Sequence, residues 1–221
     1  MYKRQDITNP FPDPYCSDKE CQTTWEYTSA RIITSSNKTV NPGNEITVCF
    51  KVPDGTGHWP AIWMLPQGFI EGNKTWPQDG EIDLMEARGR VPQAIGAAIH
   101  FANSNNSNQY ISHEVTVPMN VNFQDKFHSI TFKWIEDAIE MYLDTNSEPF
   151  YSEGKNSTPF NNANYPFNEE FYLLFNVASG GNFDSNQIDQ SKYCNDEQCS
   201  NLSNPDKGRF IIDYIEIKSI D

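Results

Sequence analysis

The 221-residue sequence has little positive charge, few histidines and no long apolar run. Its formal net charge is −14, with 16 Lys and Arg residues against 30 Asp and Glu, and no basic cluster offsets this excess. Such a chain repels polyphosphates and anionic surfaces, so we expect neither nucleic acid nor a membrane as a partner. No apolar stretch is long enough to span a bilayer, and the first ten residues lack the apolar core of a signal peptide.

Cysteine is also scarce, with five residues in the chain. Cys16 with Cys21 and Cys194 with Cys199 are close pairs in polar stretches, which predicts two local disulfides, whereas Cys49 is expected to be a buried thiol. The spacing of the pairs and the four histidines disfavour a zinc site. Glycosylation sequons begin at Asn37, Asn73, Asn105, Asn156 and Asn201. A chain rich in Asn, Ser and Thr produces sequons by chance, but together with the cysteine pairs they favour an extracellular protein.

Helical periodicity is missing, and the readable period is two. In the run EITVCFKV at 45–52, apolar and polar residues alternate, as expected of a half-buried strand. The same alternation returns at 128–134 and 139–143, with EDA between them as a hairpin turn. Further strands are expected within 94–102, 170–178 and 209–218, separated by polar loops such as 104–109 and 156–166. This pattern predicts a single all-β domain, a two-sheet antiparallel sandwich with one curved face that can hold an extended ligand.

Most of the functional information lies in the segment WPQDGEIDLMEARG at 76–89. On a regular strand Glu81 and Asp83 point to the same face, and Glu86 is out of phase. A β-bulge near Leu84 and Met85 would return Glu86 to the face of Glu81. Three carboxyl groups on one face repel one another, so a function explains them better than a purely structural strand does.

Paired carboxyl groups of this kind suit a retaining glycosidase, which needs them about 5 to 5.5 Å apart. A third carboxylate raises the pKa of the acid and orients the nucleophile, a role that suits Asp83. Trp59, Trp63 and Trp76 lie close in sequence and offer flat apolar faces to sugar rings. The alternatives are a solvated acidic strand or a calcium site that uses the same oxygens.

These residues resemble glycoside hydrolase family 16, in particular its laminarinase-like endo-β-1,3-glucanases and the related β-1,3-glucan recognition proteins. The matching motifs occur in the order of the family and cover the chain from about residue 27 to its end. They are YTSAR at 27–31, GHWPAIWMLP at 57–66, WPQDGEIDLMEARG at 76–89, the histidine of IHFAN, FHSITFKW at 127–134, FNVASGGNF at 175–183 and FIIDYIEI at 210–217. The resemblance implies a jelly-roll sandwich of the concanavalin A type with an open cleft on its concave face.

The resemblance also implies roles for individual residues. Glu81 would be the nucleophile, Asp83 the assisting acid and Glu86 the acid/base, in agreement with the reading from strand geometry. Trp63 and Trp76 would line the sugar subsites, with Trp59 a further substrate contact. His100 would face the catalytic carboxylates. Arg31 is similar to a cleft arginine of the family, and a surface charge pair is an equally good interpretation.

The implied activity is endo-hydrolysis of β-1,3-glucan with retention, with mixed-linkage β-1,3-1,4-glucan as a further substrate. No cofactor is expected for catalysis, and the chain is expected to be a monomer. The alternatives are a non-catalytic glucan-binding module, which would not need the three acids, and an inactive truncated domain. The sequence departs from the family before residue 27, where 1–26 is expected to be an irregular and incomplete start of a 27–221 catalytic domain. Missing strands would expose sheet edges and remove ligands of a structural calcium site, of which Asp213 would be a remnant.

Overall fold

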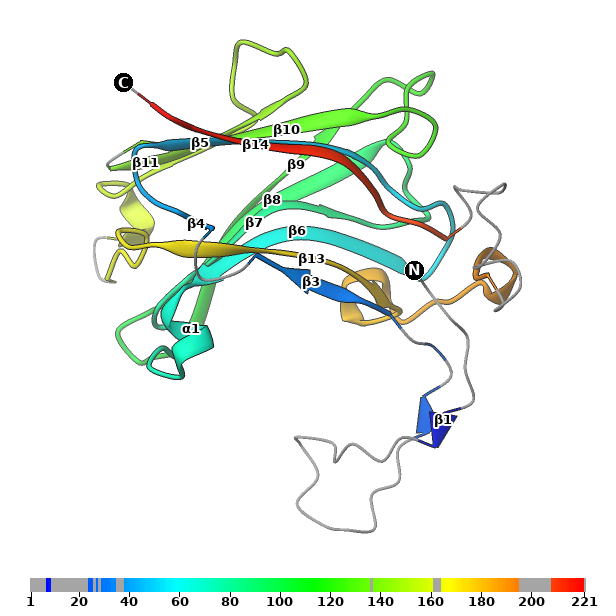
Figure 1. Cartoon of the computed structure of the whole chain (residues 1–221), viewed down its shortest axis with the longest axis horizontal. Helices are drawn as coiled ribbons and strands as arrows, with labels where there is room; N and C mark the ends of the chain where they lie inside the picture. The colour runs from blue at the N-terminus through cyan, green and yellow to red at the C-terminus, as the bar shows by residue number, and fades with distance from the viewer. Residues whose placement is uncertain are drawn as a thin grey trace.

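The computed structural model of the chain describes residues 7–8, 24–25, 27, 29–34, 38–135, 137–160, 164–194 and 208–220. Two antiparallel sheets face each other in it (Figure 1). One has the order β12-β11-β10-β5-β14, and the other β3-β13-β6-β7-β8-β9 with β4 also paired to β13. The five-stranded sheet consists of β5 (Asn44–Lys51), β10 (His128–Ile135), β11 (Ala138–Leu143), β12 (Tyr151–Gly154) and β14 (Ile211–Ser219). The seven-stranded sheet consists of β3 (Arg31–Ile33), β4 (Thr39–Val40), β6 (His58–Pro66), β7 (Glu81–Ala87), β8 (Ala94–Ala102), β9 (Asn108–Thr116) and β13 (Phe171–Ser179). The predicted two-sheet all-β sandwich is therefore confirmed.

Helical structure in the described residues is limited to short turns. It consists of α1 (Gly68–Glu71) and the 3-10 turns η1 (Thr158–Phe160), η2 (Asn182–Asp184) and η3 (Gln190–Lys192). None of these helices is long and apolar enough to cross a membrane.

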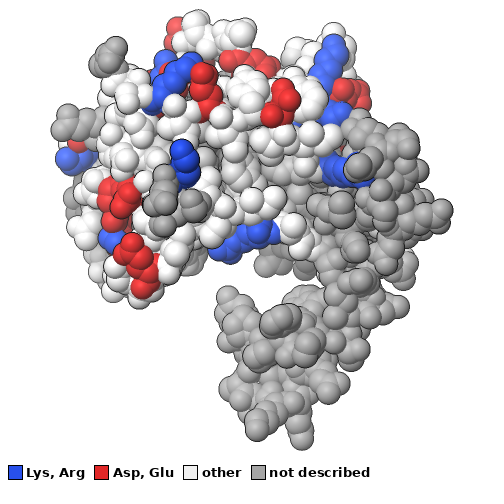
Figure 2. All heavy atoms as spheres, in the orientation of Figure 1, with Lys and Arg blue, Asp and Glu red and all other residues white. Residues whose placement is uncertain are grey.

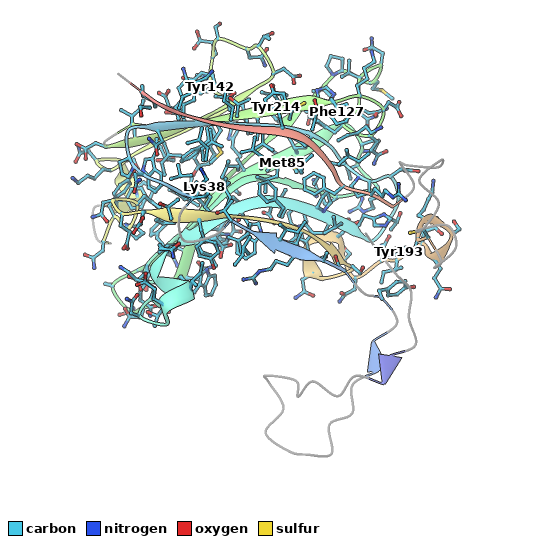
Figure 3. The ribbon with its side chains drawn as sticks, viewed as in Figure 1. Lys38, Met85, Phe127, Tyr142, Tyr193 and Tyr214 are labelled. Carbon is cyan, nitrogen blue, oxygen red and sulfur yellow. The ribbon has the colours of Figure 1, made fainter. Side chains whose placement is uncertain are left out.

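The core lies between the sheets and follows from the alternation in the sequence. Along β5, Ile46, Val48 and Phe50 are fully buried, and so is Phe132 of β10, which pairs with Ile46. Met85 of β7 points into the same interior from the other sheet (Figure 3). Each large apolar side chain buried in this way contributes about 1.5 to 3 kcal/mol, so the core fixes which face of each strand turns outward. The outward face of β7 is the one that carries the acids.

The structure adds five strands to those predicted for the two sheets, β3, β4, β6, β9 and β12, and corrects one cysteine. β9 lies partly within a stretch predicted as loop, because its mostly polar side chains are exposed at the edge of the sheet. β12 was likewise not predicted. Cys49 is a free thiol and only partly buried, because it sits on the outer face of β5. Cys16, Cys21 and Cys199 lie outside the described residues, so the disulfide pairings stay predictions.

Most of the predicted irregular segment 1–26 also lies outside the described residues. Where it is described, β1 (Ile7–Thr8) pairs with β2 (Thr24–Trp25) in a separate two-stranded sheet. The proposed domain boundary at residue 27 therefore stays a prediction.

Figure 2 shows acidic and basic side chains in small groups over one face of the molecule.

Candidate active site

β7 carries the three acids in the middle of the seven-stranded sheet, between β6 and β8. Its register shifts between Asp83 and Glu86 relative to β8, and Leu84 has no partner on β6. The predicted β-bulge is therefore present where the spacing required it. Because of this extra residue, Glu86 returns to the outward face, while Leu84 and Met85 are both buried in the core.

The outward face of β7 forms the floor of a pocket of about 260 Å³. The pocket is lined by Trp59, Ala61, Trp63, Glu81, Asp83, Glu86, Asn176 and Ala178, which come from β6, β7 and β13. β7 thus supplies the acids, β6 the two indole rings, and β13 the amide of Asn176. The small side chains Ala61 and Ala178 leave the space between them open.

The three carboxyl groups interact strongly and are largely removed from water. Asp83 is only 4% exposed and one of its oxygens, Oδ2, has no hydrogen-bond partner. Burial and the nearby Asp83 raise the pKa of Glu81 to about 8. Burial and the charge of Glu86 hold the pKa of Asp83 well above the usual carboxyl range. Burial also raises the pKa of Glu86, against the opposing effects of a hydrogen bond from Trp59 and the nearby His100. The site therefore retains protons at a pH where ordinary carboxyl groups have lost them.

His100 lies opposite Glu81 on β8 and faces the acids, as expected. Its Nε2 is 3.4 Å from Oδ2 of Asp83, and its Nδ1 is 3.2 Å from Oδ1 of Asn108. The ring lowers the pKa of Glu81 and Glu86 by its electrostatic effect. It therefore partly offsets the repulsion among the carboxylates.

The tryptophans have different roles in the structure. The Trp59 Nε1–H donates to Oε1 of Glu86 at 2.8 Å, and the Trp63 Nε1–H donates to Oδ1 of Asn176 at 2.7 Å. Trp76 lies outside the lining of the pocket, 47% exposed, with its ring centroid 6.1 Å from that of His100. Trp59 and Trp63 are thus fixed walls of the pocket, whereas Trp76 extends the aromatic surface beyond it.

Arg31 lies at the edge of this wall. Its guanidinium carbon is 5.4 Å from the centroid of the Trp63 ring. The arginine therefore contacts a pocket residue, and its role as a substrate contact stays a prediction.

Three further residues near the site were not predicted. Asn176 orients Trp63, Tyr110 of β9 lies 5.6 Å from His100 between ring centroids, and Phe183 stacks on Trp59. The signal for Asn176 is a single amide in the apolar strand 170–178. No local pattern marks Tyr110, and Phe183 ends the motif FNVASGGNF without a role assigned to it there, because the contacts of both residues are made to residues distant in sequence.

Among the described residues, the acids and histidines close enough together to hold a metal ion are Glu81, Asp83 and His100. Asp213 belongs to no such group in the described part of the chain. It is exposed on β14, next to an irregularity in the pairing with β5. A calcium site at Asp213 therefore stays a prediction, and no step of the chemistry needs it.

The fold and the site together define a β-sandwich whose outward sheet face carries coupled carboxyl groups between indole walls, an arrangement suited to polysaccharides. Residues 12–195 match the family described as Glycosyl hydrolases family 16, and the chain belongs to this family. The predicted family is thereby confirmed.

Relatives and solved structures agree with this assignment. The chain is 38% identical over 165 residues to glucan endo-1,3-beta-glucosidase A1 of Niallia circulans, covering 72% of this chain and 23% of that protein. It is 32% identical over 174 residues to the beta-1,3-glucan-binding protein of Penaeus monodon, covering 70% and 47%. The endo-beta-1,3-glucanase structure from Pyrococcus furiosus superimposes with a TM-score of 0.76 at 26% identity, covering 99% of this chain and 73% of that one. The chain thus spans less than half the length of the Niallia circulans and Penaeus monodon relatives.

Proposed function

We propose that the chain hydrolyses internal bonds of β-1,3-glucan with retention of configuration. One observation carries the proposal: a bulged strand brings Glu81, Asp83 and Glu86 to one face of an aromatic-walled pocket. In the first step Glu81 attacks the anomeric carbon, and Glu86 donates its proton to the departing glycosidic oxygen. In the second step Glu86 takes a proton from water, which displaces Glu81 from the glycosyl-enzyme and releases the second product.

The raised pKa values match these roles if the pair Glu81 and Asp83 shares a proton. Asp83 is the more deeply buried of the two, so it keeps the proton and donates a hydrogen bond to the Glu81 carboxylate. Glu81 is then ionised for attack, although two other carboxyl groups lie next to it. Burial keeps Glu86 protonated at a higher pH than an exposed glutamate, as a general acid requires.

The pocket walls favour a neutral sugar polymer. The indole rings of Trp59 and Trp63 offer apolar faces to pyranose rings, and the exposed Trp76 can extend this contact along a longer chain. A net charge of −14 does not oppose an uncharged glucan, but it repels a sulfated one. Mixed-linkage β-1,3-1,4-glucan is included as a second substrate, and the protein is proposed to act as an extracellular monomer.

A glucan-binding module without catalysis is the second candidate, because one relative is named as a binding protein. The presence of all three acids argues against it. A binding site gains nothing from buried carboxyl groups that repel each other.

The test is hydrolysis by the purified chain of laminarin, lichenan, agarose and xyloglucan, followed as reducing ends released. The matched control is Glu81→Gln, which keeps the shape of the side chain and removes the nucleophile. We expect release from laminarin by the wild type, a loss of about 10³-fold or more in the control, and retained configuration of the new end by NMR. No release from any of the four by a folded wild type, with binding to laminarin intact, would support the binding module instead.

A further inference from the structure

The loop after β13 packs against the wall of the pocket next to Glu86. Trp59 lies between Glu86 and this loop, with its Nε1–H on the Glu86 carboxylate at 2.8 Å. The ring of Phe183 stacks on the indole with a centroid distance of 4.8 Å and an interplanar angle of 24°. Gly181 lies so close that an added Cβ would be 3.0 Å from the indole ring, at a backbone φ of +91° that favours glycine. The loop is thus shaped around Trp59.

One cation–π contact and one ion pair hold this loop next to the end of β7. The Arg88 guanidinium lies 5.5 Å from the centroid of the Phe183 ring and pairs with Glu114 of β9. Next to Phe183, Asp184 is completely buried and pairs with Arg90. A buried carboxylate is costly without its partner, so the pair with Arg90 fixes the place where the loop turns. Phe183 is therefore held over Trp59 by contacts that do not involve the three acids of β7.

We propose that Phe183 is a positioning residue for Glu86: it holds the Trp59 ring so that the indole N–H stays on the carboxylate. The inference rests on the proposed function, in which Glu86 is the acid/base. Phe183 itself makes no hydrogen bond to Glu86 and acts only through Trp59.

The arrangement makes physical sense for a group that must both give and take a proton. Burial raises the pKa of Glu86, and the hydrogen bond from Trp59 opposes that rise by stabilising the carboxylate. The bond therefore keeps the carboxylate form of Glu86 accessible for the second step. Because Oε1 accepts the indole N–H, the bond also fixes the direction of the other carboxylate oxygen, Oε2. An indole without its stacking partner can tilt, and the bond weakens as its angle departs from linearity.

The kinetic test compares Phe183→Ala, Phe183→Tyr and Trp59→Phe on laminarin, with the exposed Phe127→Ala as the matched control. Phe127, labelled in Figure 3, lies just before β10 in the other sheet and is 47% exposed. For Phe183→Ala we expect kcat to fall about fivefold with KM changed less than about twofold, and the alkaline limb of the pH profile of kcat/KM to rise by about half a unit. Trp59→Phe keeps the stacking ring but loses the N–H. The alkaline limb of its pH profile should therefore move further, to a pH about one unit higher than in the wild type.

Two comparisons separate positioning from a structural role. Phe183→Tyr keeps the stacked ring and should behave like the wild type, as should Phe127→Ala. The double variant Phe183→Ala with Trp59→Phe should lose no more activity than Trp59→Phe alone, because both changes remove the same bond. A higher KM in Phe183→Ala without a shift of the limb, or additive losses in the double variant, would overturn the proposal in favour of direct sugar contact or general support.

A second measurement does not depend on hydrolysis. The indole ¹H–¹⁵N signal of Trp59, identified by its loss in Trp59→Phe, reports the protonation of Glu86 through their hydrogen bond. In Phe183→Ala its titration midpoint should rise by about half a unit, and in Phe127→Ala it should not move. A chain that cleaves no glucan but shows this rise would refute the proposed function and leave the positioning of Glu86 intact. An active chain with an unchanged midpoint would do the reverse.

Discussion

The placement of Glu81 beside two other acids opposes folding and favours acid–base chemistry at the same time. Its carboxyl group lies on a strand held from both sides, so it cannot move away from Asp83. Burial and the neighbouring carboxyl groups therefore raise the pKa values of both Glu81 and Asp83. A site of this kind is expected to lower the stability of the native state in return for a reactive group.

This leads to a prediction for Glu81→Gln that is independent of catalysis. Burial and the nearby Asp83 raise the folded-state pKa of Glu81 to about 8, so in the native state the pair of Glu81 and Asp83 holds a proton that the unfolded chain releases. The resulting destabilisation is absent below about pH 4, grows as the pH rises, and is complete above about pH 8. Glu81→Gln should therefore melt about 3 to 6 °C above the wild type at pH 8.5 and within about 1 °C of it at pH 4.

The measurement is thermal unfolding of both proteins across that range. Glu148→Gln, which changes an exposed acid, serves as the control and should follow the wild type. A Glu81→Gln variant that is less stable at every pH would mean that the carboxyl group contributes favourable contacts that exceed its burial cost.

Individual residues differed in how far the sequence could predict them. Glu81, Asp83, Glu86 and the bulge were predictable, because all four belong to one strand and follow from its period of two. Trp59 was predicted as a sugar contact, and its bond to Glu86 was not, because the two residues lie on neighbouring strands. Phe183 escaped prediction because a loop residue acquires its role only when the loop packs.

At the level of elements, strands with strict alternation were predicted with their correct faces. β5, β10 and β11 are examples, since each has one buried and one outward face. β9 was missed because its polar side chains are exposed on an edge strand, where burial does not impose an apolar pattern. β12 has only four residues, too few to show a period.

One polar contact links the start of β10 to the end of β11 and should depend on pH. The Nδ1 of His128 lies 2.8 Å from Oδ2 of Asp144, whose other oxygen accepts the Ser129 N–H at 2.8 Å. The hydrogen bond to Asp144 raises the pKa of His128. For Asp144, burial acts in the opposite direction, but the hydrogen bonds from His128 and Ser129 outweigh it and lower the pKa.

Asp144→Asn should therefore destabilise the protein in a limited pH window. A raised histidine pKa contributes stability that is full below about pH 6.5 and is lost as the pH rises through the folded-state value. We expect the melting temperature to fall by about 2 to 4 °C at pH 5.5 and by less at pH 8.5. Asp137→Asn breaks an exposed pair with Lys155 and should change little at either pH. An equal loss at both pH values would show that the Ser129 contact, not the charge of His128, carries the effect.

On the scale of the whole molecule, the core between the sheets is closed less completely at two edge strands. Among the described residues, β3 and β14 each pair with another strand on one side only. Ile32 of β3 is 65% exposed, and Ile215 and Ile217 of β14 are 42% and 40% exposed. Ile215 and Ile217 pair with the fully buried Val48 and Ile46 of β5, so they lie on the core side of their sheet. Unpaired backbone groups and apolar side chains together make such an edge a site for pairing with another chain.

The prediction is concentration-dependent association through β14 that leaves the protein monomeric when dilute. Ile217→Lys puts a charge on the edge and should abolish association that the wild type shows at about 100 μM and above, as measured by light scattering during size-exclusion chromatography. Ile135→Lys is the matched control, because Ile135 is 42% exposed but lies on β10, between two other strands. Association that persists in Ile217→Lys, or that Ile135→Lys abolishes equally, would exclude β14 as the contact. If both variants abolish association equally, the change in surface charge alone explains the loss, since each lysine makes the net charge of −14 less negative by one.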